Sequence, residues 1–267
     1  MDQPSGRRQR DLPIEEPGQT GWAGTYERWL RKYPELIHGL TLIPVYAVAS
    51  IVAGTALAPG VLFFKCLTCL YGMAGVWMDA FLSGVGLAGG FFLSGFTLMA
   101  LVPGVSALIR SRVRPDRGPS HSNRFIPWYL FNSLAYLVRY AFLEFVTPTP
   151  LSLWYFRAMG MKVGKRVVIN TTHITDAPLI TLEDGVTIGG SAVILAHYGM
   201  EGYLIIAPVV IRKNAVIGLH AKILADVEIG EGARILPGSV VMPKTVVPAG
   251  EIWGGIPAVR VDSRKIS

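Results

Sequence analysis

The sequence predicts a mixed fold in which two transmembrane helices and an interfacial helix precede a parallel β-helix domain. Two observations lead to this fold class. Residues 40–109 form long apolar segments with almost no charge, and an aliphatic residue recurs every six positions after about residue 161. The chain of 267 residues is 51% hydrophobic and only 16% charged, whereas soluble domains carry about 25% charged residues. This composition excludes disorder and coiled coil for most of the chain.

The two apolar segments, Leu40–Phe64 and Ala80–Ile109, are each long enough to cross about 30 Å of hydrocarbon. Lys65 and Asp79 are the only charged residues between positions 40 and 109. Small residues allow membrane helices to approach closely, and glycines are dense in the second segment. These glycines are Gly84, Gly86, Gly89, Gly90 and Gly95. The sequence therefore predicts two membrane helices in contact, with a buried helical hairpin of a soluble protein as the alternative.

Basic residues flank both predicted spans. They are Arg7, Arg8, Arg10, Arg28, Arg31 and Lys32 before the first span, and Arg110, Arg112, Arg114, Arg117 and Arg124 after the second. Because cytoplasmic loops are enriched in positive charge, we expect both flanks to be cytoplasmic. The net charge of +7 resides mainly in these flanks. We therefore expect membrane lipids, and not nucleic acid, as partners. Residues 1–24 are predicted to be a disordered tail.

The segment Phe125–Val146 is rich in aromatic residues and also carries Arg139 and Glu144. Aromatic rings favour the headgroup level of a membrane, so the segment predicts an interfacial helix. A third span is the alternative, which the basic loop before it disfavours. Prolines 148 and 150 then mark a domain boundary. The predicted domains are a cytoplasmic tail (1–38), a two-span hairpin with a basic loop (39–124), an interfacial and linker region (125–160) and a β-helix domain (161–267).

Large aliphatic residues recur at steps of six in the C-terminal part. They are Leu182, Ile188 and Ile194, followed by Ile211, Ile217, Ile223, Ile229, Ile235, Val241 and Val247. Neither the period of a helix nor that of a plain strand gives this spacing. Hexapeptide repeats form parallel β-helix coils, with one face of a triangle per repeat. We therefore expect these side chains to point inward over three to four turns, with Val163 and Ile169 as an earlier pair in another phase.

These repeats resemble the hexapeptide-repeat acyltransferase superfamily, whose members form left-handed β-helices. The resemblance covers about residues 161–260 and includes the Ile229–Ala233, Gly238–Val241 and Val247–Gly250 segments and a terminal G-x-P-A element at Gly255–Ala258. A narrower resemblance covers more of the chain. It includes the two predicted membrane helices, the segment Trp154–Gly160, the repeats and Trp253. In these features the chain resembles one membrane-embedded module of nonribosomal peptide synthetases of the ε-poly-lysine synthetase type.

The resemblance implies transfer of an acyl or aminoacyl group from a thioester to an amine or hydroxyl. The donor would be acyl-coenzyme A or the phosphopantetheine of a carrier protein, with no permanently bound cofactor. Three β-helices would close around an axis as a homotrimer in the bacterial inner membrane, with the N-terminus and the β-helix domain in the cytoplasm. One alternative is an O-acetyltransferase of cell-envelope glycan or lipid that uses acetyl-coenzyme A. The other is a non-catalytic membrane scaffold.

The repeat is interrupted once, by the segment His197–Tyr203. In the resembling enzymes a loop leaves a coil here, reaches a neighbouring subunit and begins with the catalytic base, which implies this role for His197. An imidazole with a pKa of about 6.5 can take a proton from an amine or hydroxyl that attacks a thioester. We expect Glu201 to orient the imidazole or hold a cationic acceptor, with simple solvation as the alternative. Tyr198 is expected to contact the substrate.

The remaining candidates lie on the coils. His173 and Asp176 are predicted to line the acceptor side of the cleft. By resemblance, the donor would lie against Gly218, His220, Ala221, Ser239, Lys244 and Arg260, each of which has a purely structural alternative. No pair of His, Cys or carboxylate residues has metal-ligand spacing, so we predict no metal. The cysteines 66 and 69 are predicted to be buried thiols, and His38 and His121 are expected at the membrane interface.

Overall fold

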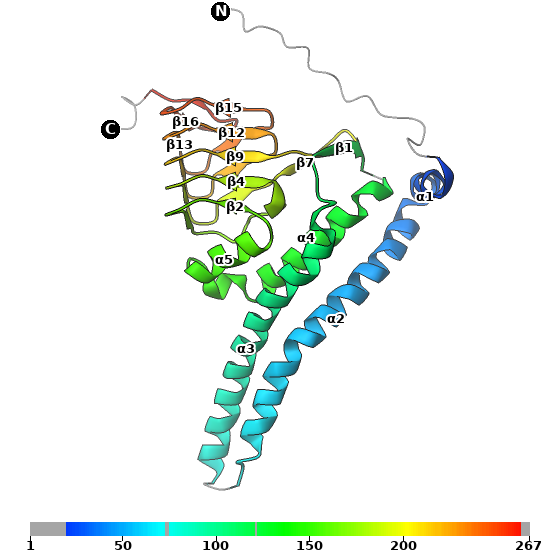
Figure 1. Ribbon diagram of the computed structural model, residues 1–267, viewed down its shortest axis with the longest axis vertical. Helices are drawn as coiled ribbons and strands as arrows, with labels where there is room; N and C mark the ends of the chain where they lie inside the picture. Colours follow the sequence, from blue (N-terminus) through cyan, green and yellow to red (C-terminus); the bar gives the residue numbers. More distant parts are fainter. Residues whose placement is uncertain (1–19, 73–74, 121, 263–267) are drawn as a thin grey trace, which may run out of the picture.

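The computed structural model describes residues 20–72, 75–120 and 122–262. A long helical hairpin, a group of shorter helices and a parallel β-helix follow one another in the chain (Figure 1). The shorter helices lie between the hairpin and the first coils of the β-helix. The predicted tail residues 1–19 and His121 lie outside the described residues.

The hairpin consists of α2 (Pro34–Thr68) and α3 (Val76–Arg110), and α1 (Gly21–Lys32) precedes it. Helices α2 and α3 contain the two predicted spans. Both are long and apolar enough, by length and composition, to cross a membrane. Helix α1 begins inside the segment that the sequence predicted to be disordered.

Glycines let α2 and α3 pack backbone against backbone, as their density in the sequence predicted. A Cβ atom on Gly60 would overlap the backbone of Gly90 and the hydroxyl of Ser94. A Cβ on Gly90 would lie 2.9 Å from the carbonyl oxygen of Gly60, and one on Gly89 would lie 2.5 Å from the ring of Phe63. Gly60 and Gly90 therefore require glycine for the observed approach of the two helices, because each faces the backbone of the other.

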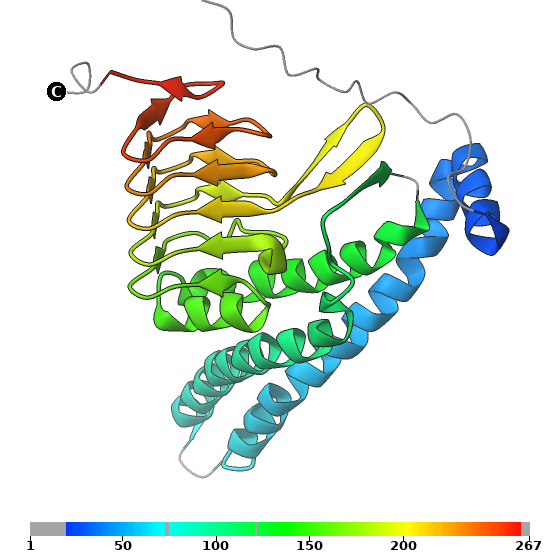
Figure 2. The same cartoon turned by 45° about the horizontal axis from the view of Figure 1, so that its top comes forward.

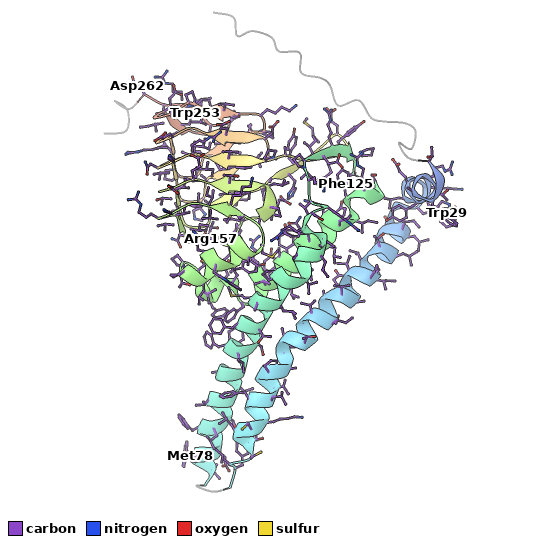
Figure 3. All side chains as sticks on the ribbon, viewed as in Figure 1. Trp29, Met78, Phe125, Arg157, Trp253 and Asp262 are labelled. Carbon is purple, nitrogen blue, oxygen red and sulfur yellow. The ribbon has the colours of Figure 1, made fainter. Side chains whose placement is uncertain are left out.

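The far end of the hairpin, near Met78, projects away from the rest of the chain (Figure 3). Apolar side chains are exposed there, including Trp77 (90%) and Leu87 (65%). Cys66 and Cys69 are exposed as well. The prediction of buried thiols is therefore wrong, because the described part of the chain provides nothing that packs against this end.

The segment predicted as an interfacial helix forms α4 (Ile126–Ala141) and a short 3-10 turn, η2 (Leu143–Val146), after a first such turn, η1 (Asn123–Phe125). With 16 residues, α4 is about 24 Å long, which is shorter than the hydrocarbon core. The third-span alternative therefore finds no support. Helix α4 has three fully buried side chains, Phe131, Leu134 and Val138. They belong to one apolar core with residues of the hairpin and of the β-helix. Helix α4 therefore joins these two parts of the chain.

Helix α5 (Pro150–Ala158) lies against the first coil of the β-helix (Figure 1). Thr149 is its N-cap, and its hydroxyl accepts a hydrogen bond from the backbone N–H of Leu151 at 3.2 Å. Phe156 and Met159 are buried and extend the apolar core from the helices into the coils.

The β-helix has three parallel faces (Figure 2). The first contains β2 (Lys162–Val163), β4 (Ile180–Leu182), β9 (Val209–Ile211), β12 (Val227–Ile229) and β15 (Val246–Val247). The second contains β3 (Val168–Ile169), β5 (Thr187–Ile188), β10 (Val216–Ile217), β13 (Arg234–Ile235) and β16 (Ile252–Gly254), with β17 (Val259–Arg260) antiparallel at its edge. The third contains β6 (Val193–Ile194), β11 (Lys222–Ile223) and β14 (Val240–Val241).

The aliphatic residues of the six-residue repeat fill the interior of the β-helix, as predicted. From Leu182 to Val247 these side chains are at most 2% exposed. Val163 and Ile169, which follow another phase in the sequence, pair in register with Leu182 and Ile188. The phase differs because the first coil has one extra residue, in a corner that contains the 3-10 turn η3 (Ala177–Leu179).

The single interruption of the repeat forms a β-hairpin of β7 (His197–Met200) and β8 (Tyr203–Ile206). Strand β8 also pairs with β1 (Asp116–Pro119), which follows α3 in the chain. Figure 2 shows this antiparallel sheet reaching from the β-helix toward the helical part. The loop predicted to reach a neighbouring subunit is thus held by a strand of its own chain.

Candidate active site

His197 and Asp176 form a hydrogen-bonded pair, here called the dyad, at the corner between the third and first faces. His197 begins β7 on the second coil, and Asp176 occupies the same corner of the first coil, in the left-handed region with φ of 58°. The bridge between Ile174 and Ile194 aligns the two coils just before this corner. The distance from Nδ1 of His197 to Oδ2 of Asp176 is 2.6 Å.

The carboxylate of Asp176 has no exposed surface, and donors surround it. Oδ1 accepts hydrogen bonds from Nε1 of Trp128 at 2.7 Å and from Nδ2 of Asn132 at 2.9 Å. Oδ2 accepts from the hydroxyl of Thr175 at 3.0 Å and from the backbone N–H of Ala196 at 3.1 Å, in addition to the imidazole. Because Trp128 and Asn132 belong to α4, the helical region completes the site.

Burial by itself would raise the pKa of Asp176. The hydrogen bond and charge of His197, together with the hydrogen bonds from Asn132 and Trp128, outweigh burial and hold this pKa below its ordinary value. The carboxylate is therefore charged at neutral pH, and Nδ1–H of His197 donates to it. The lone pair of Nε2 then faces outward on a side chain that is 21% exposed. Within the described residues, Nε2 has no hydrogen-bond partner.

The indole of Trp128 also fixes the orientation of the imidazole. The ring centroids of Trp128 and His197 are 4.9 Å apart at an interplanar angle of 75°. The edge-to-face contact and the bond to Asp176 restrain the same imidazole from two directions. One side chain of α4 thus contacts both members of the dyad.

The stabilisation that comes from Asp176 should disappear in acid. A carboxyl group whose pKa is lower in the folded state than the unfolded value of about 3.9 stabilises the fold above that pH, and this contribution is lost as the pH falls through the folded pKa. We expect the melting temperature of Asp176→Asn to lie furthest below that of the wild type near neutral pH, and the gap to shrink below about pH 4. Thermal unfolding followed by circular dichroism measures it, and a constant gap from neutral pH into this range would contradict the assignment.

The sequence predicts that Asp176 lines the acceptor side of the cleft. In the structure its side chain is fully covered, so it does not line an open cleft. Glu201 lies exposed in the turn at the tip of the β7–β8 hairpin. It is four residues from His197, which separates the two Cα atoms by about 13 Å in extended chain. The carboxylate that contacts the imidazole is therefore that of Asp176.

Tyr198 points to the opposite face of β7 from His197. Burial, followed by the charge of Asp226, raises the pKa of Tyr198. Substrate contact by Tyr198 stays a prediction.

His173 and His220 lie on the neighbouring corner, between the second and third faces. Burial and then the charge of Arg139 lower the pKa of His173, while Glu144 opposes them and His220 adds a smaller lowering effect. His220 is exposed and has a φ of 57°. These electrostatic effects place both histidines and Arg139 in one neighbourhood.

Three of the donor-site candidates take part in the packing within and between the coils of the β-helix. A Cβ on Gly218 would lie 2.5 Å from the backbone nitrogen of Pro237 on the next coil. Ala221 is fully buried, and Ser239 is 1% exposed with its hydroxyl accepting a hydrogen bond from Gly255 at 3.2 Å. These residues have only backbone groups to offer to a ligand.

The two basic candidates lie apart from each other. Lys244 is exposed on the same corner as His197, two coils further from the helices. Arg260 extends the second face and is 74% exposed, with its Nη1 3.3 Å from Glu251. The structure therefore places Lys244, but not Arg260, in line with the dyad.

No family model matches the chain. Delta-poly-L-ornithine synthetase of Acinetobacter baumannii is 30% identical over 158 residues, which are 59% of this chain and 12% of that protein. A putative acetyltransferase of Bacillus subtilis is 28% identical over 154 residues, which are 54% of this chain and 88% of that protein. These similarities support the resemblance of the chain to the hexapeptide-repeat acyltransferase superfamily. The match to a poly-amino-acid synthetase agrees with the resemblance noted from the sequence.

A solved hexapeptide-repeat acetyltransferase from Vibrio cholerae, in complex with acetyl-coenzyme A, is also similar to this chain. The two chains are 22% identical, the match covers 47% of this chain and 85% of that chain, and the TM-score is 0.40. This chain spans between 12% and 39% of the length of three curated relatives that it matches.

Proposed function

We propose that this chain is a membrane-anchored acyl or aminoacyl transferase with His197 as its general base. The acyl group moves from a thioester of coenzyme A or of carrier-protein phosphopantetheine to an amine or hydroxyl. The observation that carries the proposal is the dyad, in which a buried, charged carboxylate holds Nδ1 and leaves Nε2 of an accessible imidazole as a proton acceptor. The similarity to a serine acetyltransferase and to a putative acetyltransferase supports a thioester as the donor.

The reaction follows from this geometry. The acceptor nitrogen or oxygen forms a bond to the thioester carbonyl carbon while its proton moves to Nε2 of His197. The negative charge of Asp176 stabilises the imidazolium that results. When the tetrahedral intermediate collapses, the carbon–sulfur bond breaks and the imidazolium returns the proton to the departing thiolate. The products are the acylated acceptor and the free thiol, and the dyad returns to its starting state.

In this proposal α2 and α3 cross the bacterial inner membrane. Exposed apolar side chains along the hairpin, such as Leu62 (66%) and Phe81 (64%), support insertion, because soluble proteins rarely expose extended apolar patches. The basic flanks of the hairpin support a cytoplasmic location for the β-helix. Exposed apolar residues on the outside of the coils, such as Leu219 at a corner (51%) and Val246 on β15 (65%), support association into a homotrimer.

Thioester consumption with a panel of donors tests the proposed function. The panel contains acetyl-coenzyme A and aminoacyl and acyl thioesters of a carrier protein, with amine and hydroxyl acceptors. We expect His197→Ala to lower kcat/KM about 10²- to 10⁴-fold, because it removes the general base. Glu231→Ala, at an exposed corner of a later coil, is the matched control and should retain wild-type turnover. Equal turnover by His197→Ala and the wild type would contradict the role of His197. Absence of turnover with every donor would contradict acyl transfer and favour a membrane scaffold.

A further inference from the structure

Arg139 is a half-buried cation on α4 that the chain leaves unpaired. Among the described residues its guanidinium donates no hydrogen bond and joins no ion pair, and its Nε is buried. The rings of Tyr136 and Tyr140 flank it, with centroids 5.9 and 5.0 Å from Cζ. Arg139 lies two helical turns, about 10 Å, beyond Asn132 on the face of α4 that meets the β-helix.

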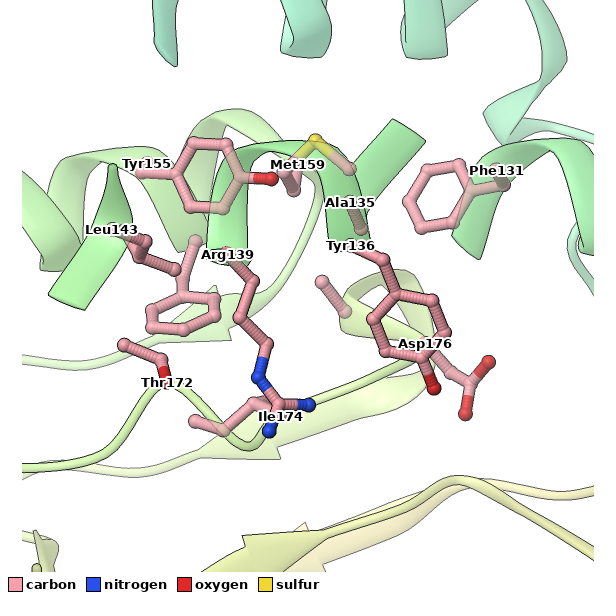
Figure 4. Close-up of a pocket in the computed structure, with 12 residues that line it drawn as sticks. Phe131, Ala135, Tyr136, Arg139, Leu143, Tyr155, Met159, Thr172, Ile174 and Asp176 are labelled. Carbon is pink, nitrogen blue, oxygen red and sulfur yellow. The ribbon is translucent and has the colours of Figure 1, made fainter. Parts of the chain in front are cut away.

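Figure 4 shows Arg139 extending from α4 toward the first coil, where Thr172, Ile174 and Asp176 lie. These residues border a cavity of about 10 Å³, which is about the smallest volume that can accommodate a water molecule. Tyr155 borders the same cavity, and its hydroxyl is buried without a partner. Burial raises the pKa of Tyr155, so the hydroxyl keeps its proton. Two polar groups therefore lack partners beside the dyad.

No carboxylate among the described residues forms an ion pair with Arg139. The carboxylate of Asp176 is fully occupied by its donors. The carboxylate of Glu144 accepts a hydrogen bond from Thr172 and makes no ion pair with Arg139. A guanidinium offers five donors in a planar fork that matches a carboxylate or a phosphate. The described part of the chain thus provides a positioned cation without its anion.

We propose that Arg139 binds an anionic group, a carboxylate or a phosphate, on the acyl acceptor. This inference rests on the proposed function, because the acceptor must place its nucleophile at Nε2 of His197. The anion belongs to the acceptor because Arg139 lies at the end of the β-helix nearest the helices. The basic candidates for the donor, Lys244 and Arg260, lie on later coils. The acceptor is thus an amine or alcohol that also carries a negative charge.

Acceptors that share one amine and differ in charge test this specificity. The probes are 6-aminohexanoate, 6-aminohexyl phosphate and the neutral 6-aminohexanamide. We expect the wild type to prefer one of the anionic amines, and Arg139→Met to reduce that preference about 10-fold to 100-fold, mainly through KM. Arg139→Lys, which keeps the charge without the fork, should give an intermediate loss. Arg234→Met, at an exposed position on β13, is the matched control and should keep the wild-type preference.

A binding measurement separates this inference from the proposed function. In the His197→Ala background we expect 6-aminohexyl phosphate or 6-aminohexanoate to raise the melting temperature, and Arg139→Met to abolish the rise. An Arg139-dependent rise without thioester consumption would leave the anion site standing while acyl transfer fails. Turnover with the same acceptor preference in the wild type and Arg139→Met would overturn the anion site and leave acyl transfer intact. Neither a preference nor a rise in the wild-type chain would also overturn the anion site. The melting temperatures of Arg139→Met and Arg139→Lys without ligand show whether each variant is folded.

Discussion

Asp176→Asn is expected to lower kcat/KM for acyl transfer about 10²- to 10⁴-fold, although the two side chains have nearly the same shape. An asparagine amide that faces Nδ1 of His197 donates a hydrogen bond, so Nδ1 must accept and Nε2 must carry the proton. An imidazole in that tautomer cannot take a proton from the acceptor, and the charge that stabilises the imidazolium is lost. Steady-state thioester consumption measures the effect.

Asp226→Asn is the matched control for this prediction. Asp226 occupies the same corner on the third coil, also in the left-handed region with φ of 61°, and its side chain is exposed. We expect Asp226→Asn to keep the wild-type rate within about twofold. Wild-type turnover by Asp176→Asn, or equal losses in the two variants, would contradict the assignment of Asp176.

Gly60→Val is expected to lower the free energy of unfolding by about 3 kcal/mol, because overpacking at a contact between two backbones has no flexible side chain to absorb it. The new Cβ would overlap the backbone of Gly90 on α3. Forcing α2 away from α3 should also lower turnover, since α4 packs on this hairpin and provides Trp128 and Asn132 to the dyad. Unfolding of the detergent-solubilised protein and thioester consumption measure the two effects.

Gly54→Val gives the comparison within the same helix. A Cβ on Gly54 meets no atom within 4 Å, so this variant should change the free energy of unfolding by less than about 0.5 kcal/mol. If Gly60→Val is as stable as Gly54→Val, then the two helices do not depend on their close contact.

The sequence predicted the elements that follow a strict period. The inward row from Leu182 to Val247 needs only a six-residue spacing to be identified, because each coil buries the same position. The ends of α2 and α3 lie within a few residues of the predicted spans because an uninterrupted apolar segment signals a helix directly. His197 could be singled out because it begins the only interruption of the repeat.

The partners of His197 could not be predicted in the same way. One extra residue in the first coil hides that Asp176 and His197 occupy the same corner of successive coils. Counting the coil from Val163 to Leu182 would have exposed this relation. Trp128 and Asn132 lie 48 and 44 residues before Asp176 in the chain, and no local pattern connects a helix to a β-helix corner. The prediction for the two cysteines is wrong because an apolar neighbourhood in the sequence does not require burial within this chain.

The double variant His197→Ala/Asp176→Asn tests the central claim most directly, because it asks whether the carboxylate acts only through the imidazole. Residues that work as one unit show strongly non-additive losses. We predict that kcat/KM of the double variant equals that of His197→Ala, so that Asp176→Asn costs nothing once the imidazole is gone. A double variant whose loss is the product of the two single losses would contradict the dyad.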